Sequence, residues 1–121
     1  MQNYKDLKVW EKAQLFTLNV YEETKSFPKE EMYSLTNQLR RAASSVPANI
    51  AEGCGKNTNA EFAHFLNIAL GSANEAEYFL ILSKDLNYLT EEKFHTLYNI
   101  INEVKGMLIA LINKVRKSPT T

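Results

Sequence analysis

Apolar residues recur at alternating spacings of three and four along most of the chain, as in helices that turn one face to a common core. Four segments carry this pattern, at about residues 7–25, 29–53, 59–86 and 91–117, followed by a short tail at 118–121. Connections this short place successive helices antiparallel. The pattern therefore predicts an all-α fold, an up-down-up-down four-helix bundle in one domain spanning residues 1–121.

The positions that we expect to face the core follow directly from these spacings. In chain order, they are Trp10, Ala13, Phe16 and Val20, then Met32, Leu35, Leu39, Ala42 and Val46, then Phe62, Leu66, Ala69, Ala73, Ala76 and Leu80, and finally Phe94, Leu97, Ile101, Val104, Leu108, Leu111 and Val115.

Capping residues mark the expected helix ends. Thr58 and Glu61 have the spacing of a capping box, and Thr90 precedes the last helix as an N-cap. Pro28 suits the first turn of the second helix. Pro47 falls inside that helix, where it removes a backbone donor, so we expect either a kink or the end of a first helical segment there.

The last two helices carry more apolar residues than one core-facing stripe needs. The additional positions are Phe65, Ile68, Phe79 and Leu82 in the third helix, and Tyr98, Met107, Ile109 and Ile112 in the fourth. Wide apolar surfaces favour self-association, since copies of the chain can cover them. The alternative is a thick core within a single chain.

Composition narrows the class of protein. The chain has 121 residues, of which 45% are hydrophobic and 23% charged. The start lacks a signal-peptide pattern, and the longest aliphatic run, 107–112, is far shorter than the roughly 20 residues that span a bilayer. Cys54 is the only cysteine, which excludes an internal disulfide. We expect a cytoplasmic protein with no membrane partner.

Two Glu-x-x-His pairs suggest a dimetal centre, because paired helices of di-iron bundles carry such motifs. Glu61 with His64 begins the third helix, and Glu92 with His95 begins the fourth. Antiparallel helices place these pairs at opposite ends of a helix about 42 Å long, at 1.5 Å per residue. A shared metal site within one chain is thereby excluded.

Two further signals of enzyme chemistry are weak. The loop 53–58 superficially resembles a phosphate-binding loop, but it lacks the first glycine, has Asn57 after the lysine, and follows a helix rather than a strand. Cys54 has no evident base to activate it, which favours a small inert thiol. The sequence therefore predicts neither an enzyme nor a cofactor.

Several motifs, taken in their order along the chain, resemble those of a known protein family. They are Asp6 to Trp10, Phe27-Pro28, Tyr33 to Ala42, Ser45 to Gly53 and Ala69 to Glu75. In this order they resemble the four-helix-bundle family of ribosomal RNA intervening-sequence proteins. The resemblance implies a ring-shaped homopentamer with no attached enzymatic activity. Related proteins of that family serve as accessory subunits of diversity-generating retroelements, where they bind a reverse transcriptase and nucleic acid.

The family's motif positions correspond here to a polar stripe and a group of small residues. Arg41, Ser45 and Asn49 lie at i, i+4 and i+8 on one helix face, and Glu52 or Glu75 is the expected counter-charge for Arg41. Gly71 and Ser72 are further motif positions that permit close backbone approach. We expect a buried or half-buried network that fixes helix register, and the competing interpretation is a ligand site on the same residues.

The formal net charge is zero, with 14 basic and 14 acidic residues, but the topology sorts them. One end of the bundle gathers the candidate nucleic-acid-binding residues, Lys5, Lys8, Lys12, Lys56, Lys114, Arg116 and Lys117, while acidic residues predominate at the other end. Phosphate backbones could dock at the basic end of an oligomer. Alternatively, these charges only complement the helix dipoles.

The function predicted from the sequence is a non-enzymatic, homo-oligomeric scaffold or adaptor, pentameric if the resemblance holds. Its main partner is a second copy of itself. The alternative is an accessory factor that binds nucleic acid through the basic end of the oligomer. RNA, DNA and an enzyme that acts on nucleic acid are therefore the other candidate partners.

Overall fold

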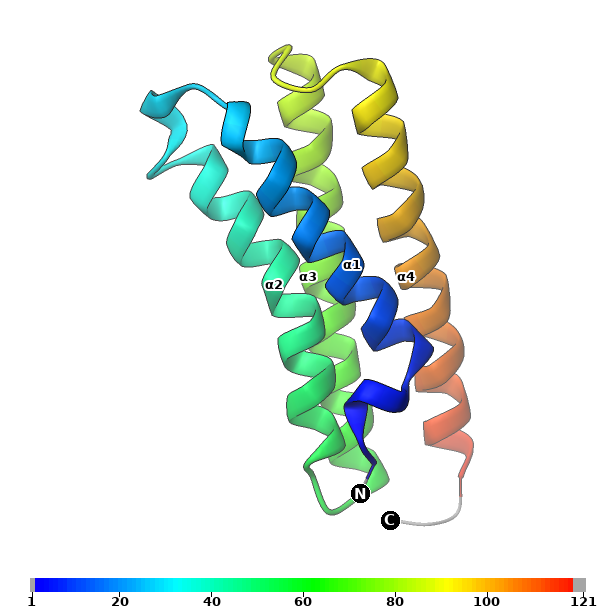
Figure 1. The fold of residues 1–121 in the computed structure, drawn as a ribbon. Coiled ribbons are helices and arrows are strands. Elements are labelled where there is room, and N and C mark those ends of the chain that lie inside the picture. Colours follow the sequence, from blue (N-terminus) through cyan, green and yellow to red (C-terminus); the bar gives the residue numbers. More distant parts are fainter. Residues whose placement is uncertain (1, 119–121) are drawn as a thin grey trace.

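The computed structural model describes residues 2–118, which form four α-helices and no strand. The helices are α1 (Lys8–Glu23), α2 (Leu35–Cys54), α3 (Asn59–Asp85) and α4 (Glu91–Lys117). Figure 1 shows them as an antiparallel bundle in which each helix packs against the two next to it, α4 closing the ring against α1. The predicted all-α, up-down-up-down bundle is confirmed.

The expected caps are present at two helix starts. Thr58 Oγ1 accepts a hydrogen bond from the Glu61 amide at 3.1 Å, and Thr90 Oγ1 accepts one from the Lys93 amide at 3.2 Å. Each bond satisfies one of the amides that a helix leaves unpaired in its first turn. The start of α3 and the whole of α4, 91–117, agree with the predicted bounds.

The other bounds differ in the first half of the chain. The segment 29–34, expected to be helical, is a short 3₁₀ turn (Lys29–Glu31) followed by an irregular stretch, and α2 begins only at Leu35. Met32 consequently lies outside α2 and is 46% exposed, so its assignment to the core was wrong. Of the predicted tail, Ser118 lies beyond the end of α4, while 119–121 fall outside the described residues.

A single core of apolar side chains runs the length of the bundle. All six residues expected from α3 are buried, as are Phe94, Leu97, Ile101, Val104 and Leu108 of α4. At the C-terminal end of α4, Ile112 is buried and Leu111 only half-buried, the reverse of the prediction. In α1 the buried residue of the first turn is Val9, and Trp10 is half-buried against Tyr4.

Helix α2 continues through Pro47, so the structure excludes the helix end that was one of the two outcomes expected there. Pro47 has no N–H to give to the carbonyl of Ala43, four residues earlier. The donor within reach of that carbonyl is Thr17 Oγ1 of α1, at 3.1 Å, which also lies 2.9 Å from the carbonyl of Ala13 in its own helix and shares its one proton between the two acceptors. A neighbouring helix thus satisfies the group that the proline leaves free, in a buried position.

Helices α2 and α3 approach closely at Gly53. A Cβ atom at this position would lie 3.0 Å from Phe65 Cβ and 3.1 Å from Phe62 Cδ1. Gly53 is itself buried, so the short connection to α3 depends on the missing side chain.

The connections at the opposite end of the bundle are tied to one another. Tyr88, after α3, donates a hydrogen bond from its hydroxyl to Glu31 Oε2 at 2.8 Å, and its ring packs against Phe27 at 5.4 Å between centroids. Asn87 beside it has a positive φ of 65°, which allows the tight turn into α4. The α1–α2 and α3–α4 connections therefore brace each other.

Candidate functional site

The polar stripe of α2 lies on the surface of the single chain. Arg41, Glu52 and Glu75 are exposed, and Ser45 and Asn49 are half-buried. Gln38, Arg41, Ser45 and Glu75 line a shallow hollow between α2 and α3. The stripe is therefore one surface shared by two helices.

The contacts of this stripe do not form the buried network expected within one chain. Asn49 Nδ2 donates to the carbonyl of Ser45 at 2.8 Å, and Glu52 pairs with Lys56 at 3.2 Å rather than with Arg41. Across residues 2–118, neither Arg41 nor Glu75 has an ion pair within 4.0 Å. Two opposite charges thus face the same hollow, and neither forms an ion pair within the described part of the chain.

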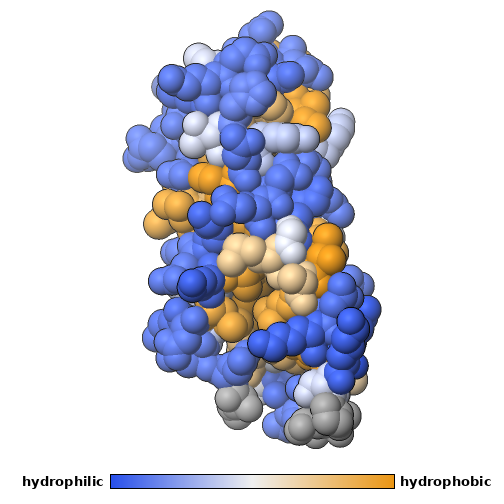
Figure 2. All heavy atoms as spheres, turned by 90° about the vertical axis from the view of Figure 1, so that its right-hand side faces the viewer, coloured by the Kyte–Doolittle hydropathy of each residue, from blue (hydrophilic) through white to orange (hydrophobic). Residues whose placement is uncertain are grey.

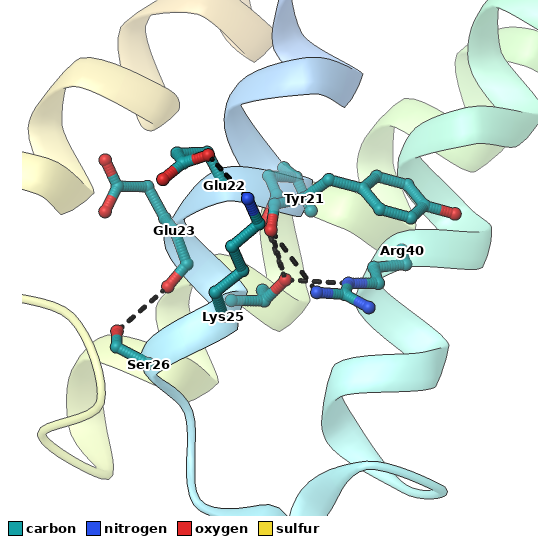
Figure 3. A network of polar contacts seen from close by, with 8 residues as sticks. Tyr21, Glu22, Glu23, Lys25, Ser26 and Arg40 are labelled. Atoms are coloured by element: carbon teal, nitrogen blue, oxygen red, sulfur yellow. Dashed lines mark hydrogen bonds and ion pairs between the residues drawn. The ribbon is translucent and has the colours of Figure 1, made fainter.

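The arginine that joins two helices is the preceding one, Arg40. Its Nε donates to Thr24 Oγ1 at 2.8 Å and its terminal nitrogen to the carbonyl of Tyr21 at 3.3 Å, while the guanidinium lies 4.7 Å from the centre of the Tyr21 ring (Figure 3). These contacts satisfy groups at the C-terminal end of α1, where a positive charge also complements the helix dipole. Sequence reasoning missed Arg40, because only the position of α1 distinguishes it from Arg41.

The segments that carry the predicted basic residues lie at the same end of the bundle. The start of the chain, the α2–α3 connection and the end of α4 meet at the lower end in Figure 1. Lys12 and Lys56 already pair with Glu103 and Glu52, each at 3.2 Å. Within the described chain, the basic residues of this set without an ion pair are Lys5, Lys8, Lys114, Arg116 and Lys117, all exposed.

The opposite end carries acidic side chains in the α1–α2 segment. Glu22 pairs with Lys25 at 3.1 Å (Figure 3), and Glu23 reaches Lys93 of α4 at the same distance. Glu30 is exposed, and Glu31 holds Tyr88. The two ends of the bundle therefore differ in charge.

Large apolar side chains remain exposed on α3 and α4. Ile68 is 40%, Tyr78 56% and Ile81 37% exposed on α3, and Ile109 of α4 is 48% exposed. Of the positions predicted to be surplus, Ile68 and Ile109 are on the surface, the others are half-buried, and Ile112 belongs to the core. Figure 2 shows apolar atoms among hydrophilic ones on the face that α4 occupies.

The described residues offer little for metal or nucleophilic chemistry. His64 and His95 are exposed near the starts of α3 and α4, and residues 2–118 contain no cluster of three or more His, Cys, Asp or Glu side chains placed to hold a metal ion. Burial raises the pKa of the Cys54 thiol, which disfavours the reactive thiolate. No helix in this part of the chain has the length and apolarity needed to cross a bilayer.

The fold and these surfaces define a small four-helix-bundle protein with unpaired charges and apolar side chains on its exterior. The family model for the 23S rRNA-intervening sequence protein matches residues 5–110. The chain belongs to this family, as the resemblance indicated. A search of curated proteins found no match.

A solved structure supports the same assignment. It is a crystal structure of a protein with unknown function from the S23 ribosomal protein family of Bacteroides thetaiotaomicron. The two chains are 32% identical, the match covers 87% of this chain and 95% of the other, and the TM-score is 0.81. Neither the family nor this relative indicates an enzyme.

Proposed function

We propose that the protein is a non-enzymatic scaffold whose copies assemble into a closed homo-oligomer, with five subunits as the family resemblance implies. The observation that carries this proposal is that α3 keeps large apolar side chains on its exposed face, among polar ones. Its inward residues fill the core, yet Ile68, Tyr78 and Ile81 still face solvent. An exposed apolar surface bordered by polar residues is typical of a contact with another protein chain.

The polar stripe fits the same proposal. Arg41 and Glu75 face one hollow beside the exposed part of α3, and neither has an ion pair among residues 2–118. Opposite charges at an interface select the correct partner surface and orientation. In an assembly, a neighbouring subunit would supply the partners that a single chain lacks, and the stripe would fix how subunits fit together.

Sedimentation velocity at micromolar concentration tests the assembly. The parent protein is expected to sediment as one species several times heavier than its 13.8 kDa chain. Ile68→Lys or Ile109→Lys places a charge in the apolar surface and is expected to release monomers, because burying an unpaired charge is costly. Asn99→Lys, a charge introduced at an exposed polar position of α4, is the matched control and should leave the mass unchanged.

Circular dichroism of the same variants separates loss of assembly from loss of folding. A parent protein that sediments as a monomer would overturn the proposal. If the oligomer persists in both lysine variants, Ile68 of α3 and Ile109 of α4 lie outside the interface.

Binding of nucleic acid at the basic end is the second candidate function. The observation that favours it is the set of side chains without ion pairs in the last turn of α4, Lys114, Arg116 and Lys117, beside the exposed Lys5 and Lys8. Repetition of this end around a closed ring would give one continuous basic surface, and phosphate contacts of this kind do not require a sequence motif.

A mobility-shift titration on structured RNA, with a duplex DNA arm, tests this candidate. Affinity is expected to fall about tenfold or more between roughly 50 and 200 mM salt, because even a few phosphate contacts make binding strongly dependent on salt. Changing Lys114, Arg116 and Lys117 together to Glu should abolish the shift. Absence of binding to either nucleic acid at low salt would eliminate the candidate.

A further inference from the structure

A cavity of about 390 Å³ lies at the basic end, where segments far apart in the sequence meet. Its wall includes the residues before α1, the C-terminal end of α2, the α2–α3 connection, the first turn of α3 and the last turns of α4. The backbone N–H of Gln2 donates a hydrogen bond to the backbone carbonyl of Cys54 at 3.4 Å and holds the start of the described chain against this wall. A volume in this range is typical of sites for small molecules.

The floor of the cavity is apolar. Leu7 and Leu111 contribute half-buried side chains, and Phe62 and Val115 border the core beneath them. Leu111 is the residue that the helical spacing assigned to the core and that the structure turns toward this space. Apolar atoms recessed behind hydrophilic ones are visible in the lower half of the α4 face in Figure 2. Such a floor favours an apolar ligand, since covering it removes apolar surface from water.

The charges at its rim are all of one sign. Among the described residues, Lys56 and Lys114 line the cavity and no carboxylate does, whereas the hollows along α1–α4 and α2–α3 each include at least one glutamate. Lys56 is held by Glu52 at 3.2 Å, and its ammonium lies 5.0 Å from the centre of the Phe65 ring. Lys114 is exposed and has no ion pair within the described chain, so its charge is available to a ligand.

We propose that this cavity binds a small amphipathic carboxylate, with its apolar body over Leu7 and Leu111 and its carboxylate against Lys114. At roughly 30 Å³ per non-hydrogen atom, the volume of a water molecule in the liquid, the space accommodates about a dozen atoms, the size of a ten-carbon fatty acid. The amino end of α3, on the same wall, adds a partial positive charge that favours an anion. The site is independent of subunit assembly, because one chain forms the whole wall.

Isothermal titration calorimetry with decanoate tests the proposal, with decan-1-ol as the neutral analogue of the same length. Decanoate is expected to bind with one site per chain, and decanol about tenfold or more weaker, because a charge-assisted hydrogen bond is lost. Amide chemical shifts of Cys54, Asn57 and Val115 should move on titration, which places the ligand in the cavity.

Three variants make the outcome specific. Lys114→Gln should weaken decanoate binding about tenfold and leave decanol binding unchanged. Lys117→Gln, which removes an equally exposed charge of the same helix turn outside the cavity, should have no effect. Leu111→Trp should fill the space and abolish binding of both ligands.

Four results would overturn the proposal. They are absence of decanoate binding, equal affinity for decanol, equal losses in the Lys114 and Lys117 variants, and chemical-shift changes confined to residues outside the cavity. Displacement of decanoate by a short RNA at high salt, where phosphate contacts alone are weak, would assign the space to a nucleic-acid base instead.

Discussion

Pro47 leaves a backbone carbonyl of α2 without its usual donor, and a side chain of α1 lies within hydrogen-bond distance of that carbonyl. The carbonyl of Ala43 would be an unpaired polar group in the core if Thr17 did not donate to it. Such a group costs about 1–3 kcal/mol when it is left without a partner. The proline of α2 and the threonine of α1 are therefore expected to be energetically coupled.

Thr17→Val is expected to lower the free energy of unfolding by about 1–2 kcal/mol, because it removes the donor to the Ala43 carbonyl. In a Pro47→Ala background, the new amide of residue 47 can bond that carbonyl within α2, so the same substitution should cost about 1 kcal/mol less. Urea denaturation of the four proteins of the cycle measures the difference. Equal costs in both backgrounds would show that the two residues are not coupled.

Gly53 is expected to be intolerant of any side chain. Gly53→Ala places a methyl group 3.0 Å from Phe65 Cβ, so α2 and α3 must separate, at a cost of about 1–3 kcal/mol. Gly106→Ala is the matched control, since a Cβ there meets nothing within 4 Å and the position lies inside α4. That substitution should stabilise the protein by about 0.5–1 kcal/mol. Thermal melting of the two variants measures these changes. A loss of stability in both would show that the space around each Cβ does not decide the outcome.

At the scale of helices, α3 and α4 are joined by a partly shielded ion pair. Lys105 Nζ lies 2.9 Å from Glu77 Oε1, and the two side chains are 21% and 18% exposed. Desolvation alone would raise the pKa of Glu77. Hydrogen bonds from Lys105, Asn102 and Tyr98, with the Lys105 charge, outweigh it and lower the pKa from its ordinary value of 4.5.

Because the folded pKa is lowered, this carboxylate stabilises the protein above its unfolded pKa, and the contribution is lost as the pH falls through the folded value. Glu77→Gln is expected to cost about 1 kcal/mol at pH 7, and the difference from the parent should shrink below pH 4.5. Denaturant titrations between pH 7 and pH 3 measure this. Glu103→Gln, which breaks the more exposed pair with Lys12, should cost only a few tenths of a kcal/mol. A pH-independent cost at Glu77 would contradict the assignment.

The connections between helices are stabilised by a second long-range contact. Tyr88→Phe removes the hydroxyl that donates a hydrogen bond to Glu31 and should lower the free energy of unfolding. Hydrogen exchange is expected to accelerate at residues 29–34, because the 3₁₀ segment loses its anchor, and to stay unchanged in the middle of α3. Uniform acceleration throughout the protein would show that the contact supports the entire bundle rather than this end.

The helices themselves were predictable, and the exceptions have physical causes. The N-caps Thr58 and Thr90 and the core positions of α3 depend on local spacing and were correct. Leu111 and Ile112 exchange roles because spacings of three and four both preserve a helical seam, so the packing at the end of α4 decides between them. Met32 continues the helical spacing of α2, yet 29–34 is a short 3₁₀ turn followed by an irregular stretch, with Glu31 bound by Tyr88.

The candidate sites were less predictable, because they depend on how helices meet. Arg40 and Arg41 are adjacent in sequence and about 100° apart around α2, and only the position of α1 determines that Arg40 is the one it contacts. The cavity draws its wall from segments separated by most of the chain, which no local pattern indicates.

At the scale of the whole molecule, Gly71 links the chain to its proposed assembly. It was expected to allow close approach of helices, yet it is exposed, and a Cβ there meets nothing within 4 Å in the single chain. No described neighbour within one chain therefore requires its small size, which is consistent with a neighbouring subunit packing against it.

Gly71→Leu is expected to keep the helical circular-dichroism spectrum while dissociating the oligomer, because the new side chain would occupy space needed by the neighbour. Mass photometry or sedimentation at several concentrations measures this. The Gly106→Leu variant, at an equally open position of α4, serves as the comparison. An unchanged oligomer would place Gly71 outside the interface.

The start of the described chain and the end of α4 lie together beside the cavity, and the α1–α2 and α3–α4 connections lie at the far end. An affinity tag or fluorophore fused to either terminus would therefore crowd the very surface on which carboxylate or RNA binding is to be measured. Labels attached through the α3–α4 connection would leave that surface open.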